Sequence, residues 1–167
     1  MARTEMLIGG RWRPAVGSGR TEDVTSPHDG SVVGTVPVAG AEDVDAALSA
    51  AGHGAQAWRR TSAHERMRIL LRAAELADQR AAETARTISA ETGKTITEAT
   101  TEAGRSGELI RLAAFEGTQL YGDTLPLDAN RGTGQDKIGF TLRQPCGIVV
   151  AITPFNYPAL LVLHKLA

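Results

Sequence analysis

The chain is poor in several residue types, and each shortage excludes a class of protein. Cys146 is the single cysteine among 167 residues, so no internal disulfide can form and a reducing compartment is favoured. A net charge of −1 gives no electrostatic basis for binding nucleic acid or an anionic membrane surface. The four histidines lack the spacing of metal ligands, so no metal partner is expected.

Long uninterrupted hydrophobic runs are also missing. Residues 1–10 lack the apolar core of a signal peptide. Residues 147–163 are apolar enough to resemble a transmembrane segment, but Pro154, Asn156 and Pro158 interrupt them. Hydrophobic residues make up 42% of the chain and charged residues 22%, as is ordinary for a globular protein. We therefore expect a cytoplasmic protein with no membrane contact.

Residues 145–158 carry the most informative pattern in the chain. Residues 148–152 are an apolar run rich in β-branched side chains, which is typical of a strand buried on both faces of a parallel sheet. Proline follows both Thr153 and Tyr157 and pushes each towards extended geometry, whereas Pro158 suits the first turn of a helix. The pattern predicts a strand, a sharp turn and a helix start. It places Asn156 at the strand end, where open α/β sheets bind ligands.

Short strands are predicted on both sides of a long central region. Gly9-Gly10 is a plausible hairpin turn within residues 6–38, which are divided into short strands by turn residues. Residues 122–136 are rich in turn-forming residues and are expected to form a loop. In residues 137–143, apolar and polar side chains alternate, which predicts a half-exposed strand.

The central region, residues 41–120, is predicted to be helical. Its apolar residues recur at helical spacing in three blocks. Ser62 begins a capping-box pattern for the second helix, Gly93 provides a left-handed stop, and Thr95 begins a second capping box. Together these patterns predict an α/β fold with a block of three helices.

At this point a resemblance to a known family becomes specific. The pattern Pro-x-Gly-Ile-Val-x-x-Ile-Thr-Pro-Phe-Asn-Tyr-Pro of residues 145–158 resembles a motif of the NAD(P)-dependent aldehyde dehydrogenase superfamily. Trp58, Glu65-Arg66 and Glu91-Thr92-Gly93-Lys94 follow the family's order. The resemblance covers nearly the whole chain but only about the first third of the family's usual length. Residues 121–128 and 140–143 are similar to the lactaldehyde, glyceraldehyde-3-phosphate and phosphonoacetaldehyde dehydrogenase branch.

The resemblance implies a division of the chain into three parts. Residues 1–130 would be the N-terminal part of the cofactor-binding domain, with short strands followed by helices. Residues 131–146 would be a bridging strand segment used for oligomerisation. Residues 147–167 would be the first parallel strand of the Rossmann-like core and the start of the following helix. A homo-oligomer is therefore expected for the full-length enzyme.

The resemblance also implies a reaction and two catalytic residues. The full-length enzyme would oxidise a small aldehyde to a carboxylate through a cysteine thiohemiacetal, and Asn156 would donate a hydrogen bond to the oxyanion. The alternative for Asn156 is a local backbone hydrogen bond, as is usual for asparagine in a turn. Lys165 matches a lysine used by some members in a proton relay; the alternative is a solvated surface lysine.

A further four residues are predicted to line the cofactor cleft for NAD or NADP, namely Ile152, Thr153, Pro154 and Phe155. The alternative is that they only end a strand and turn the chain. Cys146 is predicted not to be the nucleophile, because it begins a buried strand and has no nearby base to lower its pKa.

Several parts of the family pattern have no counterpart in the chain. The glycine-containing cofactor loop, the general-base glutamate, the nucleophilic cysteine and the last bridging strand are absent from residues 1–167. We therefore expect a truncated N-terminal segment that is inactive alone. An alternative function is a non-catalytic interaction module that pairs with a full-length homologue through residues 137–143 and the helical block.

Overall fold

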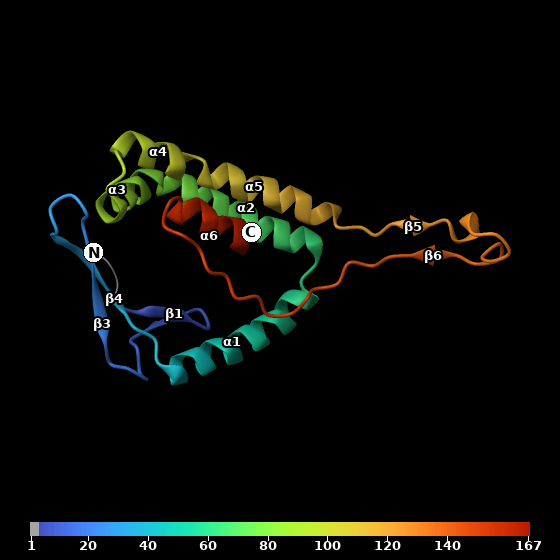
Figure 1. Cartoon of the computed structure of the whole chain (residues 1–167), viewed down its shortest axis with the longest axis horizontal. Coiled ribbons are helices and arrows are strands. Elements are labelled where there is room, and N and C mark those ends of the chain that lie inside the picture. The colour runs from blue at the N-terminus through green and yellow to red at the C-terminus, as the bar shows by residue number, and fades with distance from the viewer. Residues whose placement is uncertain (1–3) are drawn as a thin grey trace.

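The structure is a computed structural model that describes residues 4–167. Residues 1–3, which begin the first predicted domain, lie outside the described part. Figure 1 shows an open arrangement in which hairpins and a long helix surround one side of a helical bundle, while a narrow arm projects from the other side. The N-terminal strands are β1 (Met6–Ile8), β2 (Arg11–Arg13), β3 (Thr21–Thr25) and β4 (Val32–Pro37).

The N-terminal strands form two antiparallel hairpins, β1 with β2 and β3 with β4. Gly9 and Gly10 connect the first pair with φ angles of 60° and 76°. A two-residue hairpin turn of this type needs positive φ at both positions, which glycine adopts without steric cost. The predicted hairpin turn is confirmed.

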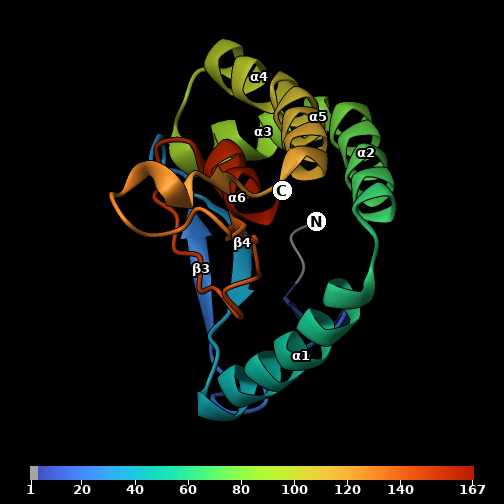
Figure 2. The same cartoon turned by 90° about the vertical axis from the view of Figure 1, so that its right-hand side faces the viewer.

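The helical block contains five helices, of which α2 to α5 pack together as a bundle while α1 lies apart from them (Figures 1 and 2). The Ser62 hydroxyl accepts a hydrogen bond from the Glu65 amide at 3.2 Å, and Thr95 forms a reciprocal capping box with Glu98. Gly93 ends its helix in the left-handed conformation, with φ 73°. The predicted Thr95 box and the Gly93 stop are thus confirmed, whereas Ser62 caps α2 without the reciprocal bond from the Glu65 side chain. The helices are α1 (Ala41–Arg60), α2 (Ala63–Gln79), α3 (Ala81–Thr92), α4 (Ile96–Gly104) and α5 (Ser106–Glu116).

Two of the three predicted helices are each divided by a one-residue break. Arg80 separates α2 from α3, and Arg105 separates α4 from α5. The Arg105 amide donates to the Glu102 carbonyl three residues earlier, at 3.2 Å, so the helix tightens locally. The apolar periodicity continues across both breaks, so spacing alone cannot reveal them. The predicted helical block is confirmed, but it consists of five helices where the sequence predicts three.

The core of this block is built mainly from alanines. Ala85, Ile88, Ala99 and Ala103 form one buried cluster at the contact between α3 and α4, and Ala159 packs against it. Small side chains let the helix backbones approach closely, and Ile88 is the largest side chain of this cluster. The first turn of the last helix is therefore attached to the bundle core.

After α5 the chain leaves the bundle and returns. A short 3₁₀ turn (Gly117–Gln119) leads into the projecting arm, where β5 (Thr124–Leu125) pairs antiparallel with β6 (Gly139–Phe140). The predicted loop therefore contains a strand and a 3₁₀ turn (Leu127–Ala129). The predicted strand at 137–143 is confirmed only at its two central residues. The chain then runs back to α6 (Pro158–Leu166), which contacts α3, α4 and α5.

The prediction of a buried strand at residues 148–152 is wrong for this chain. No hydrogen-bonded strand forms there, and Val149, Val150 and Ile152 are 70%, 75% and 86% exposed. Cys146, predicted to be buried at the start of this strand, is exposed as well. A strand exists only through hydrogen bonds to its neighbours, and no segment of residues 4–167 provides one. The apolar run therefore remains extended and uncovered.

Asp43 attaches the N-terminal segment to α1. Its buried carboxylate accepts hydrogen bonds from the backbone N–H groups of Gly40 at 3.0 Å and of Val16 and Gly17 at 3.1 Å. The Arg13 guanidinium lies 3.7 Å away. These donors, the Gly40 N–H foremost, hold the pKa of the Asp43 carboxyl below its ordinary value.

We predict that Asp43→Asn destabilises the chain most at neutral pH. A carboxyl whose pKa is lower in the folded state stabilises the fold above about pH 4, and this contribution is lost as the pH falls through the folded pKa. The variant should therefore melt at a lower temperature at pH 7 and lose less stability on acidification. Thermal melts of the original chain, Asp43→Asn and the exposed control Asp45→Asn over this pH range test the prediction. Parallel pH profiles for all three would contradict it.

Candidate functional site

The candidate site is the turn that precedes α6. Asn156 lies in this turn with an exposed side chain, between Phe155, which is 78% exposed, and Tyr157, which is 46% exposed. Within residues 4–167 the Asn156 amide makes no hydrogen bond, so the local backbone bond of the alternative interpretation is not formed. The amide is therefore available to a group outside the described chain.

The helix that follows this turn cannot cap itself. Tyr157 is the residue before the helix and its side chain makes no capping bond, while Pro158 has no N–H to donate. The first free donors are the backbone N–H groups of Ala159 and Leu160, which need an acceptor because Leu160 is 7% exposed. Pro158 begins the helix as the sequence predicts.

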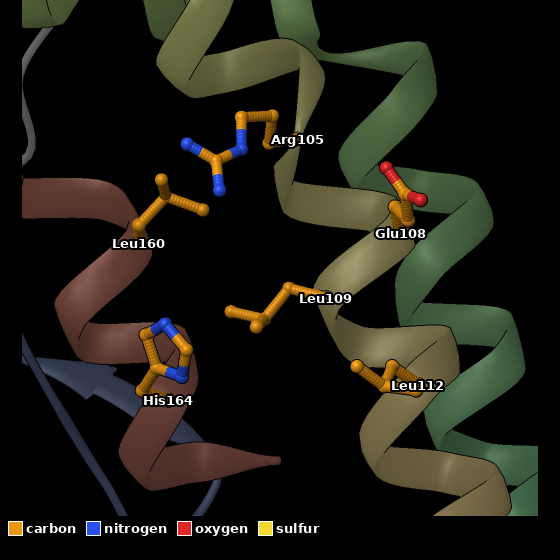
Figure 3. A pocket seen from close by; sticks show the side chains of 6 residues that line it. All are labelled: Arg105, Glu108, Leu109, Leu112, Leu160 and His164. Carbon is orange, nitrogen blue, oxygen red and sulfur yellow. The ribbon is translucent and has the colours of Figure 1, made fainter.

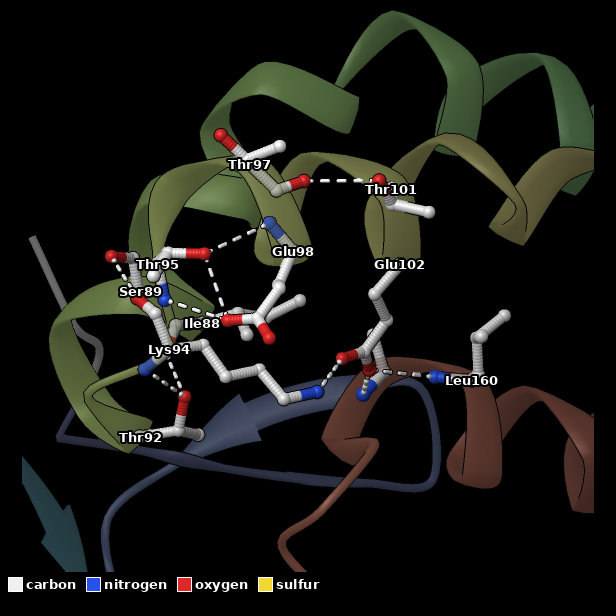
Figure 4. Close-up of polar contacts among 11 residues, drawn as sticks. Ile88, Ser89, Thr92, Lys94, Thr95, Thr97, Glu98, Thr101, Glu102 and Leu160 are labelled. Carbon is white, nitrogen blue, oxygen red and sulfur yellow. Dashed lines mark hydrogen bonds and ion pairs between the residues drawn. The ribbon is translucent and has the colours of Figure 1, made fainter.

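Glu102 of α4 supplies that acceptor from 57 and 58 residues away. Its Oε1 accepts from the Ala159 N–H at 2.9 Å and from the Leu160 N–H at 3.3 Å. Its Oε2 lies 2.7 Å from the Lys94 ammonium, and its side chain is fully buried. Figure 4 shows Glu102 between Lys94 on one side and the start of α6 on the other. One carboxylate thus joins the helical bundle to the turn that carries Asn156.

Lys94 contacts the same turn a second time. Its ammonium lies 4.0 Å from the centroid of the Tyr157 ring, which is a favourable cation–π distance. The Lys94 side chain is 21% exposed, so its charge is partly removed from water and its two contacts are correspondingly strengthened. The ion pair between Lys94 and Glu102 therefore holds the Tyr157 ring and the first turn of α6, which both follow Asn156.

The segment around Lys94 is itself fixed by hydrogen bonds (Figure 4). The Ser89 hydroxyl donates to the Lys94 carbonyl at 2.8 Å, and the Lys94 N–H donates to the Thr92 hydroxyl at 3.3 Å. The next residue, Thr95, donates from its hydroxyl to the Glu98 carboxylate at 2.8 Å and also from its backbone N–H. These two hydrogen bonds lower the pKa of Glu98. Lys94 thus reaches Glu102 from a rigid helix–helix connection.

The predicted cofactor residues form one exposed, extended segment. Ile152, Pro154 and Phe155 are exposed and Thr153 is half-buried. Within residues 4–167 their backbone groups make no hydrogen bond. Their predicted role in lining a cofactor cleft stays a prediction.

Lys165 lies apart from Asn156. It is exposed near the end of α6, seven residues after Pro158, which corresponds to about 10 Å along the helix axis. The structure therefore does not bring the two predicted catalytic side chains together. Cys146 lies before the exposed apolar run, ten residues before Asn156 in the sequence.

A cavity of about 250 Å³ lies between α5 and α6, as Figure 3 shows. It is separate from the Asn156 turn, since neither Asn156 nor Lys165 lines it. Among residues 4–167, no group of histidine, cysteine or acidic side chains could hold a metal ion, and no helix is long and apolar enough to cross a membrane. The residues around the cavity are Arg105, Glu108, Leu109, Leu112, Leu160 and His164.

Glu102 and Lys94 were missed by the sequence analysis. Lys94 belongs to the Glu-Thr-Gly-Lys pattern, which matches the family order but does not indicate a contact with Glu102 or Tyr157. Glu102 carried one detectable signal, namely a charged residue on the apolar stripe of α4 between Ala99 and Ala103, both buried. A charge at such a position needs a partner, which spacing cannot identify.

The fold and the turn define a class of protein. The chain is α/β, and α6 starts beside an exposed turn in which the Asn156 amide makes no hydrogen bond within residues 4–167. The chain belongs to the aldehyde dehydrogenase family, whose sequence profile, described as "Aldehyde dehydrogenase family", matches residues 12–167. The resemblance found in the sequence is thereby confirmed.

Individual relatives agree with this assignment. The chain is 37% identical over 98% of its length to succinate-semialdehyde dehydrogenase [NADP(+)] of Escherichia coli, covering 33% of that protein. It is also 37% identical over 98% of its length to D-glyceraldehyde dehydrogenase (NADP(+)) of Thermoplasma acidophilum, covering 32%. Relatives with different aldehydes in their names are thus equally similar, and the branch suggested by residues 121–128 stays a prediction.

Solved structures give the same result for the fold. NADP-dependent glyceraldehyde-3-phosphate dehydrogenase of Bacillus halodurans, complexed with NADP, matches with a TM-score of 0.90 and 31% identity, over 99% of this chain and 34% of that one. An E. coli NADP-dependent enzyme matches with a TM-score of 0.89 and 37% identity, over 98% and 33%. The chain therefore spans about a third of the length of these relatives, and its fold matches their N-terminal part.

Proposed function

We propose that this chain contributes the N-terminal third of an aldehyde dehydrogenase that oxidises a small aldehyde to a carboxylate with NAD or NADP. The observation that supports this most directly is the unbonded, exposed amide of Asn156, in a turn fixed by Glu102 and Lys94. A neutral amide N–H can stabilise a developing oxyanion without taking part in proton transfer. The relatives whose names specify NADP(+) support the choice of cofactor.

In the proposed reaction a cysteine thiolate from outside residues 1–167 attacks the aldehyde carbon. A carbon–sulfur bond forms, and the electron pair of the carbonyl moves to oxygen. Asn156 donates its amide N–H to this oxyanion of the thiohemiacetal, which lowers the barrier. A bound nicotinamide would supply the acceptor for the hydride that leaves the aldehyde carbon. The thioester that remains is hydrolysed by water to the carboxylate.

Other parts of the chain have supporting roles in this proposal. Residues 152–155 hold the cofactor along one wall of its cleft, and Lys165 takes part in a proton relay. Residues 1–130 and 147–167 belong to the cofactor-binding part, while residues 131–146 bridge subunits of a homo-oligomer. The 65% exposure of Phe140 on the projecting arm supports a contact of this kind. The single cysteine supports a cytoplasmic location in this proposal.

A chimera tests the proposal. Residues 1–167 replace the matching N-terminal third of the E. coli succinate-semialdehyde dehydrogenase, and aldehyde-dependent NADPH formation is measured. We expect an active chimera that remains active as Cys146→Ala, because the nucleophile lies elsewhere. We also expect the 167-residue chain alone to be inactive. Aldehyde oxidation by the isolated chain, abolished by Cys146→Ala, would overturn the proposed division of roles.

A second candidate function is a non-catalytic module that pairs with a full-length homologue. The uncovered apolar run supports it, since Val150 and Ile152 are 75% and 86% exposed and require cover. The module would be expected to co-purify with a longer dehydrogenase subunit when both are expressed together. A monodisperse monomer in the presence of that subunit would contradict this function.

A further inference from the structure

Glu102 carries more interactions with the candidate site than its distance in sequence suggests. A single buried carboxylate accepts hydrogen bonds from Ala159 and Leu160 and pairs with Lys94. Helices are normally capped by a residue at their own start, yet α6 uses a residue from α4. A buried carboxylate is costly unless it is paired, and two of the three partners of Glu102 lie in the first turn of α6.

These contacts enclose the Asn156 turn on its C-terminal side. Ala159 and Leu160 follow Asn156 by three and four residues, and Tyr157, whose ring faces the Lys94 ammonium at 4.0 Å, follows it directly. Asn156 itself makes no bond within the described chain. Its direction therefore depends on how the residues after it are held, and those residues are held by Glu102 and Lys94.

We propose that Glu102, together with Lys94, is a positioning residue that sets the direction of the Asn156 amide for oxyanion stabilisation. This inference rests on the proposed function of Asn156. In this proposal Glu102 and Lys94 act through Asn156. A displacement of about 1 Å in a reacting or stabilising group can lower the rate about 100-fold, so loss of this support has a measurable cost.

Two substitutions separate the parts of the network. Glu102→Gln keeps an oxygen that can accept from Ala159 and Leu160, but it turns an amide donor towards the Lys94 ammonium and removes the ion pair. Lys94→Met removes the charge while keeping an unbranched apolar stem, and Lys94→Arg restores the charge. Glu75→Gln is the matched control, because Glu75 pairs with Arg72 at the same 2.7 Å but both side chains are exposed.

The first measurement is made on the 167-residue chain and does not depend on enzymatic activity. The NMR order parameters of the backbone N–H groups of Asn156 and Tyr157 should fall from about 0.85 towards about 0.6 in Glu102→Gln and Lys94→Met. They should stay unchanged in Glu75→Gln and Lys94→Arg. Circular dichroism establishes that each variant keeps its helices. Unchanged order at Asn156 and Tyr157 in the folded Glu102→Gln and Lys94→Met chains would overturn the inference.

The second measurement is a double-mutant cycle in the chimera. Glu102→Gln should lower kcat about 10- to 100-fold with little change in KM, and should have no further effect when Asn156 is already alanine. If Asn156→Ala lowers kcat and Glu102→Gln does not, the inference fails and the proposed function stands. If Asn156→Ala has no effect, the proposed role of Asn156 fails. Equal effects of Glu102→Gln in both backgrounds would show that Glu102 does not act through Asn156.

Discussion

Replacing Asn156 with alanine is expected to lower kcat about 100- to 1,000-fold in the chimera that carries residues 1–167, with little change in KM. A preorganised oxyanion donor acts mainly in the transition state, so its removal affects turnover more than substrate binding. The exposed side chain of Asn156 makes no bond in the described chain, so its loss should leave the stability of the fold nearly unchanged. Steady-state kinetics with a thermal melt of each variant measure both effects.

Two companion variants define the cause of this loss. Asn130→Ala removes an exposed asparagine from the projecting arm and should leave kcat unchanged. Asn156→Asp keeps the size of the side chain but replaces the amide donor with a carboxylate, which repels an oxyanion, so its kcat should be at least as low as that of Asn156→Ala. A folded Asn156→Ala chimera with normal kcat would contradict the oxyanion role.

The largest effect on stability is expected from Ile88→Ala. Ile88 is 4% exposed and packs among the alanines of α3 and α4. Its truncation should leave a cavity, because the helix backbones are already close together and cannot move inward to fill it. We expect the free energy of unfolding to fall by about 2–4 kcal/mol, which is a large part of the stability of an ordinary domain. Denaturant unfolding followed by circular dichroism measures this change.

The matched control for this substitution is Ile69→Ala. Ile69 lies on α2 and is 46% exposed, so the same truncation removes fewer contacts and should cost less than about 1 kcal/mol. Because Ala159 packs against the Ile88 cluster, Ile88→Ala should also loosen the start of α6. Hydrogen exchange at the Leu160 amide should then increase. Equal losses in the two variants would show that the cluster is not the main core.

The sequence by itself determined the features that depend on neighbouring residues. The Gly9-Gly10 turn, the Thr95 capping box and the left-handed Gly93 follow from local backbone geometry, which does not depend on the rest of the fold. Pro158 begins α6 because its ring fits only the first turn of a helix. The family was also detectable, since the residues that carry it are contiguous in positions 145–158.

Only the tertiary structure decided how distant segments satisfy one another. Glu102 lies on the apolar stripe of α4, but its partners in α6 lie 57 and 58 residues away, and no local pattern encodes them. The apolar run at 148–152 has the composition of a buried strand, yet it stays exposed because a strand needs a hydrogen-bonded neighbour, and residues 4–167 supply none. Local geometry thus determined the turns and caps, whereas burial and pairing required the folded chain.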